Sequence, residues 1–479
     1  MERTKALSAR AASLWQRIAA QGPLRERFLQ GLGTRVELVA LQGASSLGED
    51  FRRLRGRSVL IATQEQLTAA FALIELDGIA ARMVLCPPRR SMAEIESIAT
   101  QAEADAIIYD TADQSAAFAH LGMPVRCTAS LVPSDGAAER RHVTTTQPTE
   151  WVLLTSGTTG EPKLVVHSLA TLAGDLQTST ASAAGTIWST HYDIRRFGGL
   201  QILLRALLCG GSLVLSDPEE SIRDFLQRTA RAGVTHMTGT PSHWRRVLMS
   251  GSAQLLDPAY VRMSGEIADQ PILDHLRATY PRAAIVHAFA STEAGLAFEV
   301  TDELAGFPES FVSRTDSHVQ LRIEHDSLLI RSPRTSSHYL NRCAEALRRE
   351  DGFVDTHDLV ELRHGRYHFV GRRGGIINVG GQKCHPEEIE SVINRHPRVR
   401  MSLVRSRKSP LLGSVVVADV VLNGAAAAEP ARDSASQTVR NEILAACRES
   451  LSAHKVPATI RIVESLDMTP AGKLRRPNA

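Results

Sequence analysis

Residues 151–163 of the chain read WVLLTSGTTGEPK, and this stretch decides how the rest of the sequence is interpreted. The apolar residues 151–154 predict a buried strand, and the nine residues that follow hold four hydroxyl side chains, two glycines and Lys163. Glycines let the backbone approach a ligand closely, and successive N–H groups can surround phosphate oxygens. A surface turn rich in Ser, Thr and Gly is the alternative without a function, but this composition directly after a strand favours a phosphate-binding loop. It is not a Walker A loop, because no Gly-Lys-Ser/Thr ends it and Pro162 precedes the lysine.

The chain before this loop alternates strand and helix patterns. Residues 58–62, 83–85 and 106–109 are short apolar runs typical of buried strands. Residues 64–76 and 91–102 carry apolar side chains at three- and four-residue spacing, as amphipathic helices do. This alternation predicts an α/β fold in which crossover helices connect the strands of a parallel sheet.

The chain after the loop continues this pattern and then changes. Further strands are expected at residues 210–215 and 285–289, and an antiparallel hairpin is expected within residues 317–332. The last block has an expected strand (376–379), helix (386–396), strand (415–422) and helix (437–452), with a flexible loop at 423–437. We therefore predict a large N-terminal domain with parallel-sheet subdomains (residues 1–370), a hinge (371–375) and a small mobile α+β domain (376–479).

Composition limits the class of protein. The 479 residues are 43% hydrophobic and 22% charged, as in ordinary globular proteins, and the formal net charge is only +3. This near-balance argues against a nucleic-acid partner. The six cysteines are scattered, which predicts neither a zinc site nor a disulfide framework and suits a reducing compartment. No apolar stretch reaches the roughly 20 residues of a transmembrane helix, so we expect a cytoplasmic protein.

The wording of residues 155–163 resembles the phosphate-binding signature of the adenylate-forming superfamily, which includes acyl- and aryl-CoA synthetases, peptide-synthetase adenylation domains and luciferase. Four further segments match in the expected order, so the resemblance covers residues 151–476. It implies that ATP activates a carboxylic acid as an acyl-adenylate and that a thiol then accepts the acyl group. The implied cofactors are ATP, magnesium and coenzyme A, or the phosphopantetheine of a carrier protein. By the resemblance, Thr155, Ser156, Gly157, Thr158, Thr159, Gly160 and Lys163 bind phosphate.

The second matching segment is FASTE, residues 289–293, where the family usually has Tyr-Gly-x-Thr-Glu. The resemblance implies that Phe289 lies against the adenine, Thr292 contacts phosphate and Glu293 holds magnesium, a cation that prefers oxygen ligands. Ala290 stands in place of the family's glycine. Without this context Glu293 would be interpreted as a solvated surface acid.

The third and fourth segments are THD (residues 356–358) and residues 371–390. The resemblance assigns Asp358 to the ribose hydroxyls and Arg372 to the ribose or phosphate. His357 replaces a glycine, and if that position needs φ > 0 the histidine is strained. The resemblance also places the pivot of the small domain at Gly374 and Gly375, and a tunnel for the thiol arm at Gly380 and Gly381.

The fifth segment is TPAGKLRR, residues 469–476, where Lys473 takes the place of the family's catalytic lysine. An ammonium group there can bridge the attacking carboxylate and the α-phosphate as negative charge builds up. By its composition alone, this segment would be a solvated basic tail.

The acid pocket is the least defined part of the sequence. Residues 189–199 (STHYDIRRFGG) occupy the place where many relatives carry an aromatic or histidine gate, which makes His191, Tyr192 and Arg195 candidates. Asp193 raises the alternative that the substrate is an amino acid whose ammonium it holds. A polar loop with one structural salt bridge is an equally good interpretation. Gly265, in the Ser-Gly-Glu segment, is expected near the adenine or the acid.

Three functions follow from these observations. The first is an acyl- or aryl-CoA ligase acting on a small-molecule carboxylic acid. The second is a stand-alone adenylation enzyme that loads an acyl or amino acid onto a separate acyl carrier protein. The third is a non-catalytic nucleotide-binding relative, suggested by His357, Ala290 and the glycine pivot. The presence of Lys473, Glu293 and Asp358 favours an enzyme.

Overall fold

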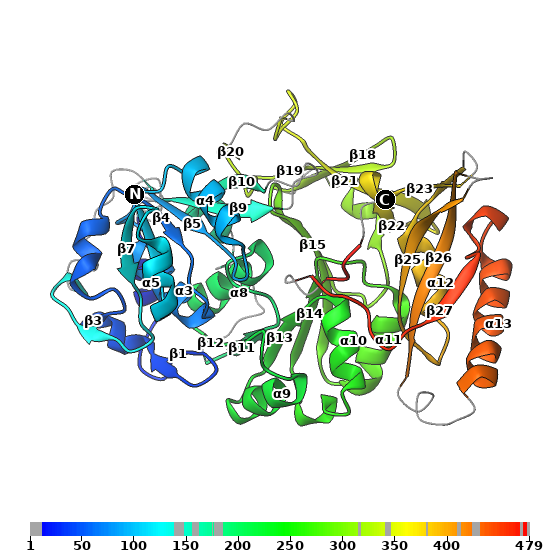
Figure 1. Ribbon diagram of the computed structural model, residues 1–479, viewed down its shortest axis with the longest axis horizontal. Coiled ribbons are helices and arrows are strands. Elements are labelled where there is room, and N and C mark those ends of the chain that lie inside the picture. The colour runs from blue at the N-terminus through cyan, green and yellow to red at the C-terminus, as the bar shows by residue number, and fades with distance from the viewer. Residues whose placement is uncertain are drawn as a thin grey trace.

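The structure is a computed structural model that describes residues 12–137, 148–155, 162–174, 176, 185–314, 318–340, 346–379, 382–409, 413–423, 432–469 and 473–476. Figure 1 shows the first sheet in blue and cyan at one side, the second sheet in green in the middle, and the C-terminal elements in orange and red at the other side. No helix in these described ranges is long and apolar enough to cross a membrane.

The first sheet has seven strands in the order β20-β10-β9-β5-β4-β6-β7. β4 pairs in parallel with β5 and β6, and β5 pairs in parallel with β9, so the carboxyl ends of these strands lie along one edge. The strands expected at 58–62, 83–85, 106–109 and 151–154 are thereby confirmed. The bounds are β4 (Ser58–Ile61), β5 (Arg82–Leu85), β6 (Ala106–Tyr109), β7 (Met123–Arg126), β9 (Glu150–Thr155), β10 (Lys163–Ser168) and β20 (His338–Tyr339), with helices α3 (Gln66–Leu76), α4 (Met92–Gln101) and α5 (Ala112–Phe118).

The second sheet has eight strands in the order β16-β15-β14-β13-β11-β12-β1-β2. Its central strands, β11 to β15, run parallel to one another. The sequence analysis missed β1, which joins this sheet by pairing in parallel with β12. The strands are β1 (Phe28–Gln30), β2 (Arg35–Glu37), β11 (Ile187–Thr190), β12 (Ser212–Leu215), β13 (His236–Gly239), β14 (Tyr260–Ser264), β15 (Ala284–Ser291) and β16 (Gly295–Val300). The helices are α2 (Leu14–Ala19), α7 (Leu169–Ala173), α8 (Phe197–Leu208), α9 (Ile222–Arg231), α10 (Pro241–Met249) and α11 (Gln270–Thr279).

The largest hydrophobic cluster joins these two sheets. It takes in α3, α8, Trp151 of the first sheet and Trp188 of the second. Every residue of α3 is buried, so the helix is present where it was expected but is not amphipathic. A helix that is covered on all sides needs no polar face.

The third sheet is antiparallel, with five strands in the order β17-β22-β21-β19-β18. The expected hairpin within residues 317–332 is confirmed as β18 (Gln320–Glu324) and β19 (Ser327–Arg331). The longer strands β21 (Val354–Arg363) and β22 (Arg366–Arg372) carry the chain to the C-terminal elements, and β17 (Phe307–Pro308) completes the sheet.

The C-terminal elements form a small domain of their own, as the sequence predicted. β25 (Val399–Ser409), β26 (Gly413–Leu422) and β27 (Thr459–Ile462) form one sheet, and β23 (Ile377–Val379) pairs with β24 (Gln382–Cys384). Helices α12 (Pro386–Ile393) and α13 (Arg432–Ser450) pack on them around a separate core. α13 begins before the expected residue 437, so the end of the expected loop is helical. The boundaries that the sequence predicts for the two domains and the hinge remain predictions.

Candidate functional site

The C-terminal segment returns to the large domain and places Lys473 beside Gly265. Figure 1 shows this segment in red, running back from the small domain toward β14. A Cβ atom on Gly265 would lie 3.2 Å from Cε of Lys473, and Gly265 has a φ of +85°. Both the left-handed backbone and the close approach of the lysine favour glycine at this position. The structure thus brings together two residues that the sequence singled out separately.

Glu266 holds the Lys473 segment in place. Its Oε1 accepts a hydrogen bond from the N–H of Leu474 at 3.1 Å, and its Oε2 accepts one from the N–H of Ser242, in the first turn of α10, at 2.9 Å. Further along, Arg476 donates to both carboxylate oxygens of Glu390 on α12, at 2.9 and 2.6 Å. The lysine segment is therefore bound to both domains.

The electrostatic surroundings of Lys473 contain both signs of charge. Its side chain is exposed, yet the protein around it is dense enough that desolvation lowers the pKa of the ammonium group. The carboxylates of Glu266 and Asp358 raise this pKa, whereas the guanidinium groups of Arg372 and Arg196 lower it. An accessible, partly desolvated ammonium group can interact strongly with an incoming anion.

Asp358, in the middle of β21, pairs with Arg372 at the end of β22. Nε of Arg372 is 3.3 Å from Oδ1 of Asp358, and Nη2 of Arg372 donates to the carbonyl of Thr356 at 3.0 Å. Desolvation raises the pKa of Asp358, while the charges of Arg372 and Lys473 oppose that shift. This arrangement can offer a carboxylate to hydroxyl groups and a guanidinium to an anion.

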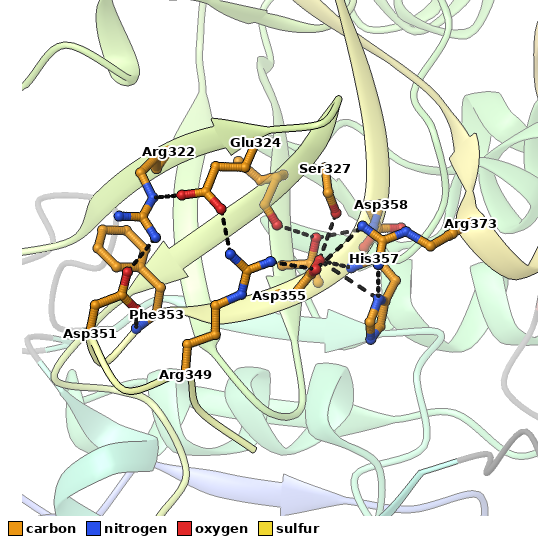
Figure 2. Close-up of polar contacts among 12 residues, drawn as sticks. Arg322, Glu324, Ser327, Arg349, Asp351, Phe353, Asp355, His357, Asp358 and Arg373 are labelled. Carbon is orange, nitrogen blue, oxygen red and sulfur yellow. Dashed lines mark hydrogen bonds and ion pairs between the residues drawn. The ribbon is translucent and has the colours of Figure 1, made fainter. Parts of the chain in front are cut away.

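His357 has a φ of +58°, so the position between Thr356 and Asp358 does require left-handed backbone. Asp355 supports it: Oδ1 accepts from the N–H of His357 at 2.9 Å and from Oγ of Ser327 at 2.6 Å. Arg373 reaches the same place, with Nη1 3.3 Å from Nδ1 of His357 and Nη2 3.4 Å from Oδ2 of Asp355 (Figure 2). The substituted histidine is thus tied to the residue that precedes the predicted pivot.

The pivot glycines, Gly374 and Gly375, lie in a single short turn (Arg373–Gly375). A Cβ atom on either glycine would meet nothing within 4 Å. No packing therefore opposes a change of backbone angles at these two residues, which suits the predicted hinge without testing it.

Glu293 lies in the turn between β15 and β16. Its carbonyl accepts from the N–H and Oγ of Ser336, at 2.8 and 3.0 Å. Its carboxylate makes no hydrogen bond or ion pair with another described residue, so it is available to a ligand. The preceding carbonyl, of Thr292, accepts from Nε2 of the buried His167 at 2.7 Å. Within the described ranges no three acidic, histidine or cysteine side chains gather as a metal cluster. A single free carboxylate fits magnesium, which is commonly held by one or two carboxylates together with phosphate oxygens.

Phe289 lies in an aromatic cluster. Its ring stacks on that of Phe369 at a centroid distance of 4.9 Å and on that of Phe298 at 5.7 Å. The register of β15 against β16 shifts between Phe289 and Ala290, directly before the turn that carries Thr292. The stacking holds the Phe289 ring in a defined orientation, half-buried, as a surface for a planar group would be.

Of the candidates for the acid pocket, Tyr192 contacts β14 and His191 contacts α10. The hydroxyl of Tyr192 lies 2.9 Å from the carbonyl of Ser264 and 3.0 Å from its Oγ. The ring of His191 stacks on that of His243 at 5.0 Å, and burial lowers the pKa of His243 to about 3. Two neutral imidazoles and a phenol therefore lie close together, and the phenol contacts the residue before Gly265.

Asp193 and Arg195 form a buried ion pair. Nε and Nη2 of Arg195 contact Oδ1 and Oδ2 of Asp193, each at 2.8 Å, and the arginine also donates to the carbonyls of Thr63 and Gln64. Both oxygens of the carboxylate are thereby occupied. The structure favours the salt-bridge interpretation of this loop over a role for Asp193 in holding a substrate ammonium.

Part of the predicted phosphate loop lies outside the described residues. The loop residues that lie outside are Ser156, Gly157, Thr158, Thr159 and Gly160. The predicted tunnel residues Gly380 and Gly381 also lie outside the described residues. The two ends of the loop are described: Thr155 pairs with Lys163 as the last pair of the antiparallel strands β9 and β10. The loop therefore connects two strands, unlike a Walker A loop, which leads into a helix.

Three supporting residues were missed in the sequence. His167 contacts the carbonyl of Thr292, His243 stacks on His191, and Asp355 accepts from the N–H of His357. Asp355 directly precedes the predicted segment 356–358, and that proximity was its only signal; the two histidines lie far along the chain from these partners, and no motif marks them. Glu266 was expected, with Ser264 and Gly265, near the adenine or the acid, but no role was assigned to it.

Two family models and several curated proteins match this chain. A family model described as AMP-binding enzyme matches residues 54–328, and one described as AMP-binding enzyme C-terminal domain matches residues 388–473. A 2-succinylbenzoate–CoA ligase of Listeria innocua is 26% identical over 335 residues, 68% of each chain. The Bacillus subtilis ligase of the same name is 25% identical over 349 residues, again 68% of each chain.

Solved structures share the whole fold. An anthranilate–CoA ligase in complex with anthranoyl-AMP has a TM-score of 0.78 and 16% identity, over 97% of this chain and 96% of that chain. ATP-bound MatB from Rhodopseudomonas palustris has a TM-score of 0.78 and 19% identity, over 97% of both chains. Both likenesses include the small domain as well as the large one.

Proposed function

Because the chain belongs to the AMP-binding enzyme family, we propose that it is an ATP-dependent acid–thiol ligase of the acyl- or aryl-CoA ligase type. The observation that carries the proposal is the position of Lys473, which the C-terminal segment brings beside Gly265 within the field of Asp358 and Glu266. A basic tail with no role would not be bound to both domains through Glu266 and Glu390.

In the first step, a carboxylate oxygen of the acid attacks the α-phosphorus of ATP. The bond from that phosphorus to the bridging oxygen breaks, and the electron pair leaves with pyrophosphate. The Lys473 ammonium lies where it can stabilise the negative charge that builds up on the attacked phosphate. The mixed anhydride that forms is a far better electrophile than the free acid.

The nucleotide is held by residues from several elements. Asp358 accepts from the ribose hydroxyls, Arg372 contacts ribose or phosphate, and Phe289 and Ala290 lie against the adenine. Thr292 and the loop that runs from Thr155 to Lys163 contact the phosphates. Magnesium, held by Glu293, would offset charge on the phosphate oxygens.

In the second step, a thiol sulfur attacks the acyl carbon, and AMP leaves with the former carboxylate oxygen. The small domain turns about Gly374 and Gly375, so that the arm of the thiol can approach past Gly380 and Gly381. The names of the relatives favour coenzyme A as the acceptor over a carrier protein. The acid is a small-molecule carboxylic acid, and exchange assays with different acids can identify its class.

The test is ATP–pyrophosphate exchange against a panel of aryl, fatty and amino acids, with Lys473→Ala as the control. We expect exchange that depends on one class of acid and is lost in the variant, because the ammonium acts in the transition state. Both proteins should still bind ATP. Adding coenzyme A or a phosphopantetheine-loaded carrier protein then identifies the acceptor from the thioester formed.

Two results would contradict the proposal. If ATP binds but no acid supports exchange, the chain is a non-catalytic nucleotide-binding relative. If exchange is equally fast in the Lys473→Ala variant, the lysine is not the group that stabilises the transition state.

A further inference from the structure

Arg196 is a half-buried cation, and Asp193 is the carboxylate whose charge acts on it. Arg196 directly follows the ion pair of Asp193 and Arg195, in which both carboxylate oxygens are already held by the other arginine. Nε of Arg196 is buried and has no hydrogen-bond partner, and no ion pair of its side chain is found in the described part of the chain. Burial is the main cause that lowers the pKa of this guanidinium. Asp193 raises this pKa through its charge but makes no ion pair with Arg196 in the described residues, so the guanidinium can still gain from a bound anion.

The position of Arg196 is set by the fold. It precedes α8, and its neighbour Arg195 donates to the carbonyl of Gln64, just after β4, at 3.1 Å. The charges that act on Arg196 are, largest first, those of Asp193, Arg90, Arg195 and Cys86. Of these residues, Arg90 and Cys86 follow β5. Since β4, β5 and β9 are neighbouring parallel strands, their carboxyl ends lie along one edge, and β9 ends at Thr155. Arg196 therefore lies at the edge from which the predicted phosphate loop departs.

The charges around Arg196 favour an anion there. Arg90 is paired with Glu94 at 2.6 Å and Arg195 with Asp193, whereas the charge of Asp193 acts on Arg196 without an ion pair between the two in the described residues. The charge of Arg196 also reaches Lys473, the ammonium expected at the α-phosphate. A second group at this edge lacks a partner: Oγ1 of Thr155 is buried and unbonded among the described residues. A cation and a hydroxyl are both available where the triphosphate is expected.

We propose that Arg196 binds the β- and γ-phosphates of ATP, and the pyrophosphate formed from them, at the edge where β4, β5 and β9 end. The inference rests on the proposed function. When the α-phosphorus bond to the bridging oxygen breaks, the electron pair and its negative charge remain on pyrophosphate. The planar guanidinium can donate two hydrogen bonds to that group and offset the added charge. Arg196 is thus a ligand of the leaving group, acting beside Lys473.

The test compares three ligands in wild type and in Arg196→Gln. ATP and inorganic pyrophosphate should bind about ten- to a hundredfold more weakly to the variant, because charge-assisted hydrogen bonds are lost. AMP, which lacks the β- and γ-phosphates, should bind equally well to both proteins. Arg196→Lys should be intermediate, since it keeps the charge but loses the planar fork. In exchange assays, the KM for pyrophosphate should rise in both variants.

Arg90→Gln is the matched control, because it removes a neighbouring cation that already has a partner in Glu94. It should leave ATP binding nearly unchanged; an equal loss there would overturn direct contact by Arg196. Thermal unfolding shows whether the Arg196 variants fold, and removing an unpaired charge should not lower Tm. If Arg196→Gln binds ATP normally but raises the KM of the acid, Arg196 is a ligand of the acid and the inference is wrong. If wild type itself shows no ATP binding or exchange, the proposed function fails instead.

Discussion

The N–H of Leu474 donates a hydrogen bond to Oε1 of Glu266 at 3.1 Å, which joins the segment that carries Lys473 to the chain leaving β14. The other oxygen of the same carboxylate accepts from the N–H of Ser242 at 2.9 Å. Glu266 therefore joins three segments through its hydrogen bonds. Its negative charge also raises the pKa of Lys473, which favours the protonated form. The placement of the lysine depends on a residue outside the motif that contains it.

Replacing Glu266 by Ala should slow adenylation about ten- to a hundredfold, because a misplaced catalytic group loses much of its effect. ATP binding should change little, since Glu266 is not expected to contact the nucleotide. Glu266→Gln keeps an oxygen acceptor and should lose less. Exchange assays and ATP titrations measure the two effects separately. A variant that loses ATP binding and exchange together would place Glu266 in the nucleotide site.

The alkaline limit of the reaction should move in Glu266→Gln. Lys473 must be protonated to stabilise negative charge; desolvation lowers its pKa and Glu266 raises it. Without the Glu266 charge the pKa falls further, so activity should be lost at a lower pH than in wild type. The rate of exchange against pH shows this shift on the alkaline side only. An unchanged alkaline limb would mean that another group titrates there.

Replacing His357 by Gly should stabilise the protein relative to His357→Ala by about 1 kcal/mol, because only glycine adopts left-handed backbone without cost. Both variants lose the contact with Arg373, so their difference isolates the strain at the φ of +58°. Urea unfolding of the two variants measures it. Equal stabilities would show that Asp355 already relieves the strain through the N–H of His357.

Asp193→Asn should destabilise the protein by about 3 to 5 kcal/mol, because Arg195 would remain buried without its partner. Replacing Asp193 and Arg195 together by Asn and Met should cost less than the single change. Urea unfolding compares these variants. The substrate-ammonium interpretation would return if the single variant were fully stable but had lost exchange with amino acids.

The stability of the protein should fall in mild acid because His167 is buried and neutral. Desolvation lowers its pKa to about 4, so the unfolded chain binds a proton between pH 6.5 and 4 that the folded chain does not. Stability is therefore lost as pH falls through this window, by about 2 kcal/mol from this residue between pH 6.5 and 5. Urea unfolding at several pH values, for wild type and His167→Gln, measures it. The variant should show a shallower dependence; an identical slope would assign the effect to other groups.

Much of the fold could be predicted from local patterns. The apolar runs at β4, β5, β6 and β9 are strands buried on both faces, and such runs are visible without any partner. β1 was missed because three residues carry too short a pattern, and its pairing with β12 depends on a strand far along the chain. α3 was expected to be amphipathic, but its burial from all sides follows from how the two sheets pack.

The sequence by itself determined the family, the order of the motifs and the chemical type of the residues expected in the site. Those features are local, because each lies within a few consecutive residues whose spacing reflects one strand, turn or loop. Only the tertiary structure decided that Glu266 binds the Lys473 segment, that Asp193 pairs with Arg195, and that Nε of Arg196 has no hydrogen-bond partner among the described residues. Such pairings join residues through space, and the free energy of a charge depends on which partners the fold places beside it.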